Sequence, residues 1–151
     1  MFGENVNLDK VYFNAIEKYY NDKELVEFIK QGEEMAIQMS KGEIVTEAST
    51  GGNLLVRYID SEQGVFILGV VSKSGKMNKN DIKSYHKWVK ELLILLKKGH
   101  PILSSPNKLS KPLLNKIITK AEKEGLNTKQ ETMGTFERNG MLWENIMLTL
   151  A

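Results

Sequence analysis

The sequence contains no cysteine, only three prolines and two histidines, and no Walker loop. Without cysteine, a disulfide framework, a thiol nucleophile and thiolate metal ligands are all excluded. His86 and His100 have no H-E-x-x-H spacing, and no serine lies in a G-x-S-x-G motif, so neither a zinc site nor a hydrolase triad is expected. We therefore predict no metal site, expect both histidines to be structural or surface groups, and find nucleotide hydrolysis disfavoured.

Long apolar runs are also missing, because the longest, Leu92–Leu96, lies inside an amphipathic segment. The N-terminus has neither a basic start nor an apolar stretch, which argues against a signal peptide. The length of 151 residues, with 41% apolar and 26% charged residues, is typical of a single globular domain. We expect one domain over residues 1–151, a cytoplasmic location and no membrane contact.

Charge is unevenly distributed along the chain. Residues 73–123 carry 13 lysines against 3 acidic residues, whereas residues 1–72 carry 6 basic against 12 acidic residues. A basic middle segment favours a polyanionic partner, either nucleic acid or a phosphate-rich cofactor, with Lys83, Lys87 and Lys90 as candidate contacts. Solvated helix faces explain the same lysines equally well. Because the chain has only two arginines and this segment has few aromatic residues, nonspecific phosphate contact is favoured over sequence-specific readout.

The clearest structural pattern spans residues 64–105. Gly64–Ser72 is almost wholly apolar, which is typical of a central strand that is covered on both faces. Asp81–Lys98 has helical periodicity, and Pro101–Ser105 favours a short strand. A strand, a helix and a second strand in this order predict a right-handed crossover between parallel neighbours. The buried face of the helix is expected to carry Ile82, Tyr85, Val89, Leu92, Leu93 and Leu96.

The segments before this crossover predict two helices and then three strands. Apolar spacing favours one helix over residues 8–20 and another from a cap at Asp22 to Lys41, which Gly32 is expected to split. Short turns predict antiparallel pairing of the strands Glu43–Ser49, Asn53–Asp60 and Gly64–Ser72. In the middle strand, one set of alternate side chains is Leu54, Val56 and Tyr58, and the other is Leu55, Arg57 and Ile59.

The C-terminal part predicts a helix and a hairpin. Ser110–Glu124 has an apolar helical face, and Asn139-Gly140 is a strong hairpin turn between the strands Thr128–Arg138 and Met141–Leu150. Taken together, the elements predict an α/β (α+β) domain with a single mixed, mostly antiparallel sheet flanked by helices and ending in a hairpin.

This order of elements resembles the GNAT (Gcn5-related N-acetyltransferase) fold over nearly the whole chain. In that family, strand backbone groups pair with the pantetheine of acyl-CoA, and a glycine-rich turn at the next helix start presents N–H groups to the pyrophosphate. The stretches that look like these parts are Leu68–Ser72 and Ser74–Asn80. The resemblance implies acetyl-CoA as the cofactor, with candidate contacts at Leu68, Val70, Val71, Ser74, Gly75, Lys76, Lys79 and Asn107.

The chain departs from the family pattern at several points. The glycine-rich turn is reduced to one glycine, Gly75, and Asp81 at the helix start already occupies the positive end of the helix dipole, where it would repel a phosphate. The alternative is that Lys76 and Lys79 offset this negative charge. The family's tyrosine general acid corresponds to Ala121, and its first strand is missing or reduced to Met1–Val6. Such erosion is similar to that of GNAT-like proteins encoded by tailed phages, some of which are carried in virions.

These observations lead to three hypotheses. The first is a non-catalytic, phage-encoded binding or structural protein, in the virion or the host cytoplasm, that acts through a protein partner or self-association. The second is an acyl-CoA-dependent N-acetyltransferase acting on an amine, with Glu43 or Glu47 as candidate base; surface decoration is the alternative role for both. The third is a nonspecific nucleic-acid binder that uses the lysine-rich segment.

Overall fold

The computed structural model describes residues 8–104, 110–138 and 141–151 of the chain. In chain order its elements are α1 (Leu8–Tyr20), α2 (Lys23–Ser40), β1 (Glu43–Ala48), β2 (Leu54–Ser61), β3 (Gly64–Ser72), α3 (Lys79–Lys97), β4 (Ile102–Ser104), α4 (Ser110–Lys123), β5 (Thr128–Arg138) and β6 (Met141–Leu150). Met1–Val6, Ser105 and the Asn139-Gly140 turn, all of which carried sequence predictions, lie outside the described residues.

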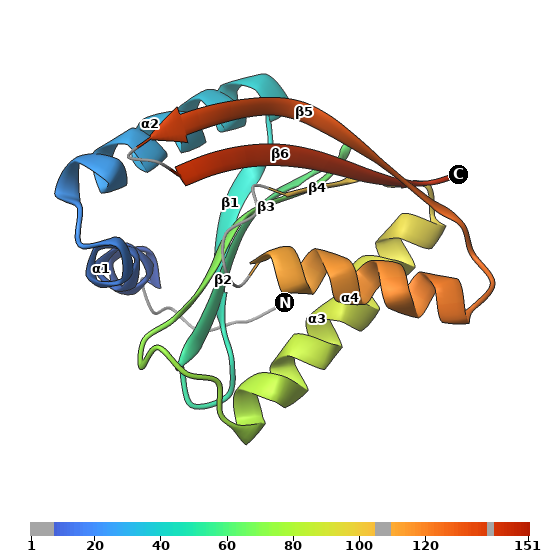
Figure 1. Ribbon diagram of the computed structural model, residues 1–151, viewed down its shortest axis with the longest axis horizontal. Helices are drawn as coiled ribbons and strands as arrows, with labels where there is room; N and C mark the ends of the chain where they lie inside the picture. The colour runs from blue at the N-terminus through green and yellow to red at the C-terminus, as the bar shows by residue number, and fades with distance from the viewer. Residues whose placement is uncertain (1–7, 105–109, 139–140) are drawn as a thin grey trace.

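The strands form one six-stranded sheet in the order β1-β2-β3-β4-β6-β5. β3 and β4 are parallel, as a crossover through α3 requires, and the other neighbouring pairs are antiparallel. Figure 1 shows α1 and α2 on one side of β1–β3, and α3 and α4 on the other side. The predicted fold class, a mixed and mostly antiparallel sheet flanked by helices, is therefore confirmed.

Two apolar layers follow from the alternation of side chains along β2. Leu54 and Val56 face α3 and α4, in the larger core cluster that also contains Trp88 and Ile117. Leu55 faces the other way and packs in a smaller cluster with α1 and α2, whose buried members are Tyr12, Ala15, Ile16, Val26, Leu55 and Val71. Each fully buried side chain of this size contributes roughly 1.5–3 kcal/mol, so both helical layers are held mainly by apolar burial.

A bulge in β3 changes which of its alternate side chains face which layer. Arg57 pairs with Gly69 and Tyr58 with Ile67, which leaves Leu68 as an extra residue in β3. The extra residue reverses the alternation of side chains along β3. Val65 and Ile67 before the bulge and Val70 after it therefore belong to the larger cluster. Within the described residues, the pairing of β3 with β4 ends at Ile67 and Ser104, and β3 itself continues to Ser72.

Two details of the helices differ from the sequence predictions. α2 is continuous through Gly32, because the cost of a helical glycine, roughly 0.5–1 kcal/mol, is small beside the burial of Leu25 and Val26 on the same helix. Ile82 is 45% exposed, although helical periodicity predicted it to be buried. The preceding residue, Asp81, occupies the buried position in the first turn of α3 instead.

The C-terminal hairpin forms with the predicted bounds and a nearly continuous register from Thr128↔Leu150 to Arg138↔Met141. In β6, Leu148 is fully buried, and Ile146 and Leu150 pack against the larger cluster. The hairpin thus closes one edge of the sheet next to β4.

Gly64, at the start of β3, requires the absence of a side chain. Its φ of 143° is rarely adopted by residues with a side chain, and an added Cβ would lie 2.4 Å from the Pro101 carbonyl oxygen. We predict that Gly64→Ala lowers the free energy of unfolding by roughly 1–3 kcal/mol from the backbone conformation alone. Urea denaturation followed by circular dichroism measures this.

Gly32→Ala is the matched control, because an added Cβ at Gly32 meets no atom within 4 Å. It is expected to raise the free energy of unfolding by about 0.5–1 kcal/mol. A Gly64→Ala protein that is as stable as the wild type would contradict the close approach to Pro101.

Candidate functional site

The stretch predicted to pair with pantetheine is the second half of β3. Val70 is 1% and Val71 is 2% exposed, and they belong to the two opposite apolar clusters, while Leu68 at the bulge is half-buried. The side chains of this stretch therefore build the core. Only its backbone is a candidate for contact with a ligand.

The α3 entry loop, residues 73–78, carries most of the predicted pyrophosphate contacts. The residues concerned, three in the loop and one in the first turn of α3, are all exposed: Ser74, Gly75, Lys76 and Lys79. The loop satisfies several of its own N–H groups. Ser74 N donates to Asn53 Oδ1 at 3.0 Å, Gly75 N donates to the Ser72 carbonyl at 3.3 Å, and Lys76 N donates to Ser74 Oγ at 3.3 Å. These three amides are thus directed to groups of the protein itself.

The start of α3 is closed by the carboxylate of Asp81, which is 0% exposed. Asn78 and Asp81 form a capping box, in which each side chain accepts the backbone N–H of the other residue. Asp81 Oδ1 also accepts from Ser49 Oγ at 2.5 Å, and Oδ2 accepts from Asn53 Nδ2 at 2.6 Å. The carboxylate therefore occupies the place at the helix dipole that an external anion would take.

These hydrogen bonds set the charge state of Asp81. Burial by itself raises the pKa of Asp81, but the hydrogen bonds that the carboxylate accepts, beginning with that from Ser49, outweigh burial and hold the pKa below its ordinary value. Asp81 is therefore a fixed negative charge at the helix start around neutral pH.

The remaining predicted contacts are not brought to this loop. Asn107 lies outside the described residues. Ala121, at the position of the family's tyrosine acid, is 0% exposed in the larger core cluster. Lys83, Lys87 and Lys90 are exposed on α3, and polyanion contact through them stays a prediction. His86 is exposed and His100 half-buried.

The two candidate bases on β1 have different surroundings. Glu43 is exposed, but Glu47 is only 1% exposed, so surface decoration is the wrong interpretation for Glu47. Glu47 Oε1 accepts from the Tyr58 hydroxyl at 2.5 Å, and Oε2 has no hydrogen-bond partner among the described residues. Burial raises the pKa of Glu47, and the hydrogen bond from Tyr58 opposes that rise. Glu47 thus has one oxygen that is not yet satisfied.

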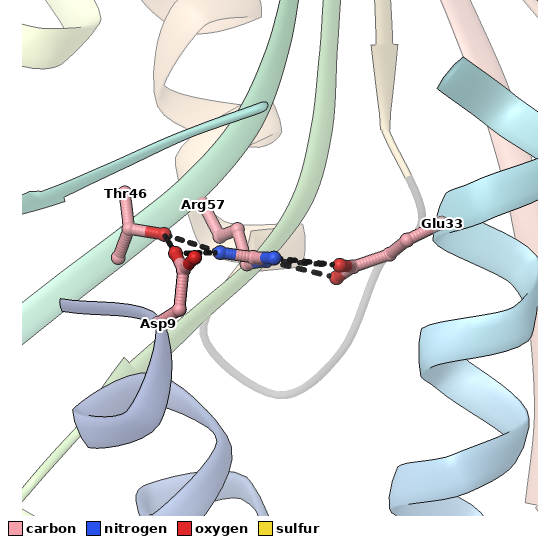
Figure 2. Close-up of polar contacts among 4 residues, drawn as sticks. All are labelled: Asp9, Glu33, Thr46 and Arg57. Carbon is pink, nitrogen blue, oxygen red and sulfur yellow. Dashed lines mark hydrogen bonds and ion pairs between the residues drawn. The ribbon is translucent and has the colours of Figure 1, made fainter. Parts of the chain in front are cut away.

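A second polar centre, which the sequence patterns did not single out, surrounds Arg57 of β2. Figure 2 shows Arg57 between Glu33 of α2 on one side, and Asp9 of α1 and Thr46 of β1 on the other. Arg57 Nε lies 3.0 Å from both Glu33 oxygens and Nη2 lies 2.8 Å from Oε1, while Nη1 donates to Asp9 and Thr46 at 2.6 Å each. The guanidinium also lies 4.8 Å from the centroid of the Phe13 ring.

The Arg57–Glu33 pair is an ionised buried pair, with both side chains 5% exposed. Burial by itself lowers the pKa of Arg57, but the hydrogen bonds and charge of Glu33 raise it above its ordinary value. Burial raises the pKa of Glu33 against the opposing effect of Arg57. The bidentate geometry requires a carboxylate that accepts, so we assign a negative charge to Glu33. This centre is structural, since each of the three guanidinium nitrogens donates to a protein group.

Arg57 gave one signal in the sequence. It is one of only two arginines and stands between Leu55 and Ile59 in the alternating pattern of β2, where an apolar residue would be ordinary. The two carboxylates that accept from Arg57 are 24 and 48 positions away from it, on helices whose packing the pattern does not specify.

Within the described residues, no three histidine or acidic side chains gather as a metal ion requires. None of the described helices combines the length and the apolar character needed to cross a membrane.

Breaking the Arg57 centre is expected to be costly. We predict that Arg57→Met lowers the free energy of unfolding by about 3–5 kcal/mol, because Glu33 is left as a buried carboxylate without its partner. The double variant Arg57→Met/Glu33→Met is expected to recover much of this loss. Lys97→Met, which breaks an exposed pair with Glu124, is the control and is expected to cost less than about 1 kcal/mol. Urea denaturation distinguishes these outcomes, and equal effects of Arg57→Met and Lys97→Met would contradict the assignment.

Asp81 generates a prediction about pH. Its pKa is lower in the folded protein than in the unfolded chain, so its stabilisation is complete above about pH 4 and is lost as the pH falls through the folded-state pKa. We predict that the difference in unfolding free energy between the wild type and Asp81→Asn shrinks as the pH is lowered from 5 to 2. Urea titrations at a series of pH values measure it, and a difference that does not change with pH would contradict the prediction.

Comparison with known proteins adds no relative to this description. No family model matches the chain, and neither a curated protein nor a solved structure matches it. The GNAT-like resemblance therefore rests on the order of the elements.

Proposed function

We propose that this chain is a non-catalytic binding domain on a GNAT-like scaffold, whose acyl-CoA site is closed at the start of α3. The observation that carries the proposal is the buried carboxylate of Asp81, which is held by Ser49, Asn53 and Asn78. A pyrophosphate at this helix start would meet a fixed negative charge instead of the free N–H groups that bind anions elsewhere.

The exposed lysines of the loop do not compensate for this charge. Lys76 and Lys79 are exposed, so their attraction to a phosphate is weakened by water and by salt. Opening the site would also require Asp81 to leave three donors inside the protein, and a buried carboxylate that loses its donors is destabilising. The loop is thus better suited to holding α3 against β2 than to receiving a cofactor.

A domain of this kind acts through its surface, and we propose a protein partner or a second copy of the chain as what it binds. A place in a phage virion or in the host cytoplasm remains part of the proposal, on the resemblance described above. The resemblance places the tyrosine general acid of the family at Ala121, which is buried in the core. The absence of that acid supports the hypothesis of a non-catalytic protein.

An acyl-CoA-dependent N-acetyltransferase is the second candidate, and one observation favours it. In the described part of the chain, the parallel pairing of β3 with β4 reaches Ile67, and β3 itself continues past the bulge at Leu68 to Ser72. The backbone of this part of β3 is where pantetheine would pair if a cofactor were bound. The same titration tests both candidates.

The test is calorimetric titration of the wild-type protein with acetyl-CoA at low and moderate salt. We predict no binding that survives moderate salt, because Asp81 repels the pyrophosphate and exposed lysines are screened. Transfer of an acetyl group to an amine such as spermidine is measured by the free thiol that it releases. The rate of this transfer is expected to stay at the uncatalysed value. Micromolar binding at moderate salt, or transfer at an enzymatic rate, would overturn the proposal.

Two double variants separate a specific site from general charge. Lys76→Ala/Lys79→Ala removes the lysines next to the α3 start, and Lys10→Ala/Lys18→Ala removes two exposed lysines of α1. If acetyl-CoA binds, and only the first pair of substitutions abolishes binding, the cofactor site is preserved. The N-acetyltransferase hypothesis then replaces the hypothesis of a non-catalytic binding domain.

A further inference from the structure

A partly open cavity of about 310 Å³ lies between α3 and the strands β1–β3. It is separate from the α3 start, since neither Asp81 nor any residue of the α3 entry loop lines it. Its walls are mostly apolar and come from strands and helix alike: Val56, Val65, Ile67, Trp88, Leu92 and Leu95. The volume is at the lower end of the range for sites of small molecules, so the cavity suits a compact ligand.

Among the described residues that line this cavity, Glu47 is the one charged residue that is buried. Its Oε1 accepts from Tyr58, and among the described residues no donor reaches its buried Oε2. A buried acceptor without a donor costs about 1–3 kcal/mol, and more when it is charged. A ligand that brings a donor to Oε2 would remove that cost and gain a charge-assisted hydrogen bond.

The charges around the cavity select the sign of the ligand. Asp60 and Glu91 line the same cavity as Glu47, and no lysine or arginine is among its described lining residues. Lys87 of α3 lies near enough to lower the pKa of Glu47, but it does not line the cavity. Three carboxyl groups on apolar walls attract a cation and disfavour an anion.

We propose that the Glu47 cavity binds a small primary amine with an apolar body. The ammonium group donates to Glu47 Oε2, while the apolar body lies against Trp88 and Leu92. An ammonium group offers three N–H donors and a positive charge. The donors match Oε2 of Glu47, which has no partner among the described residues, and the charge matches the three carboxyl groups that line the cavity. A quaternary ammonium has no N–H to donate, and an alcohol has no charge, so both are poorer ligands for this arrangement.

This inference does not depend on the proposed function. Failure of amine binding would leave Asp81 and the closed α3 start as they are, and binding of acetyl-CoA would leave the Glu47 cavity as it is. The two proposals are therefore tested by different ligands at different residues.

The experiment is a titration of the full chain, labelled with ¹⁵N, with hexylamine at neutral pH, observed through the indole N–H signal of Trp88. Hexylamine is expected to cause saturable shifts at millimolar concentration, with hexanol and hexyltrimethylammonium binding at least about tenfold more weakly because each lacks the charge or the donor. Absence of saturable shifts with hexylamine, or equal binding of the alcohol, would overturn the proposal.

Matched variants assign the binding to Glu47. Glu47→Gln keeps the shape and an acceptor for Tyr58 but removes the charge, and it is expected to weaken hexylamine binding about tenfold or more. Glu43→Gln makes the same change at an exposed position of β1 and is expected to bind like the wild type. If the two variants lose binding equally, general charge explains the effect and the proposal fails.

A second variant covers the case in which Glu47→Gln does not fold. Leu92→Trp fills the cavity from α3 without changing any charge, and it is expected to abolish the shifts caused by hexylamine. Full amine binding by a folded Leu92→Trp protein would show that the ligand lies elsewhere and would overturn the assignment to this cavity.

Discussion

The buried guanidinium of Arg57 joins the two N-terminal helices to the sheet. A charge inside a protein is tolerated only when it is paired and fully hydrogen-bonded, so Asp9, Glu33 and Thr46 must reach it from α1, α2 and β1. Apolar burial gives this layer most of its stability but little directional preference. The fork of hydrogen bonds adds direction, and the position of both helices on the sheet depends on it.

Three buried carboxyl groups show three ways of satisfying an acid in this fold. Glu33 is paired with a cation, Asp81 is held by neutral donors at a helix start, and Glu47 receives one hydroxyl. The first two are satisfied by the protein itself and so serve structure. Glu47 keeps an oxygen without a donor among the described residues and lines a cavity, which makes it the one with chemistry left for a ligand.

Much of the fold was predictable because it follows from local periodicity. The alternation in β2 separated Leu54 and Val56 from Leu55, and these side chains do face opposite layers. Predictions failed where tertiary contacts overrode local preference: α2 runs through Gly32, and Ile82 is exposed while Asp81 is buried. The candidate site was harder, since Glu47 was named only as one of two strand acids, and no local pattern indicated its burial.

By itself the sequence determined the element order, the parallel crossover and the terminal hairpin, because hydrophobic periods of about two and 3.6 residues and turn residues act over short distances. It also determined that Asp81 stands at a helix start, where the dipole favours a carboxylate. Only the tertiary structure decided which charges are satisfied. Arg57, Ser49 and Asn53 come from strands or turns remote in sequence from the acids they contact. Burial, which makes those contacts strong and leaves one oxygen of Glu47 without a donor among the described residues, arises only when the helices cover the sheet.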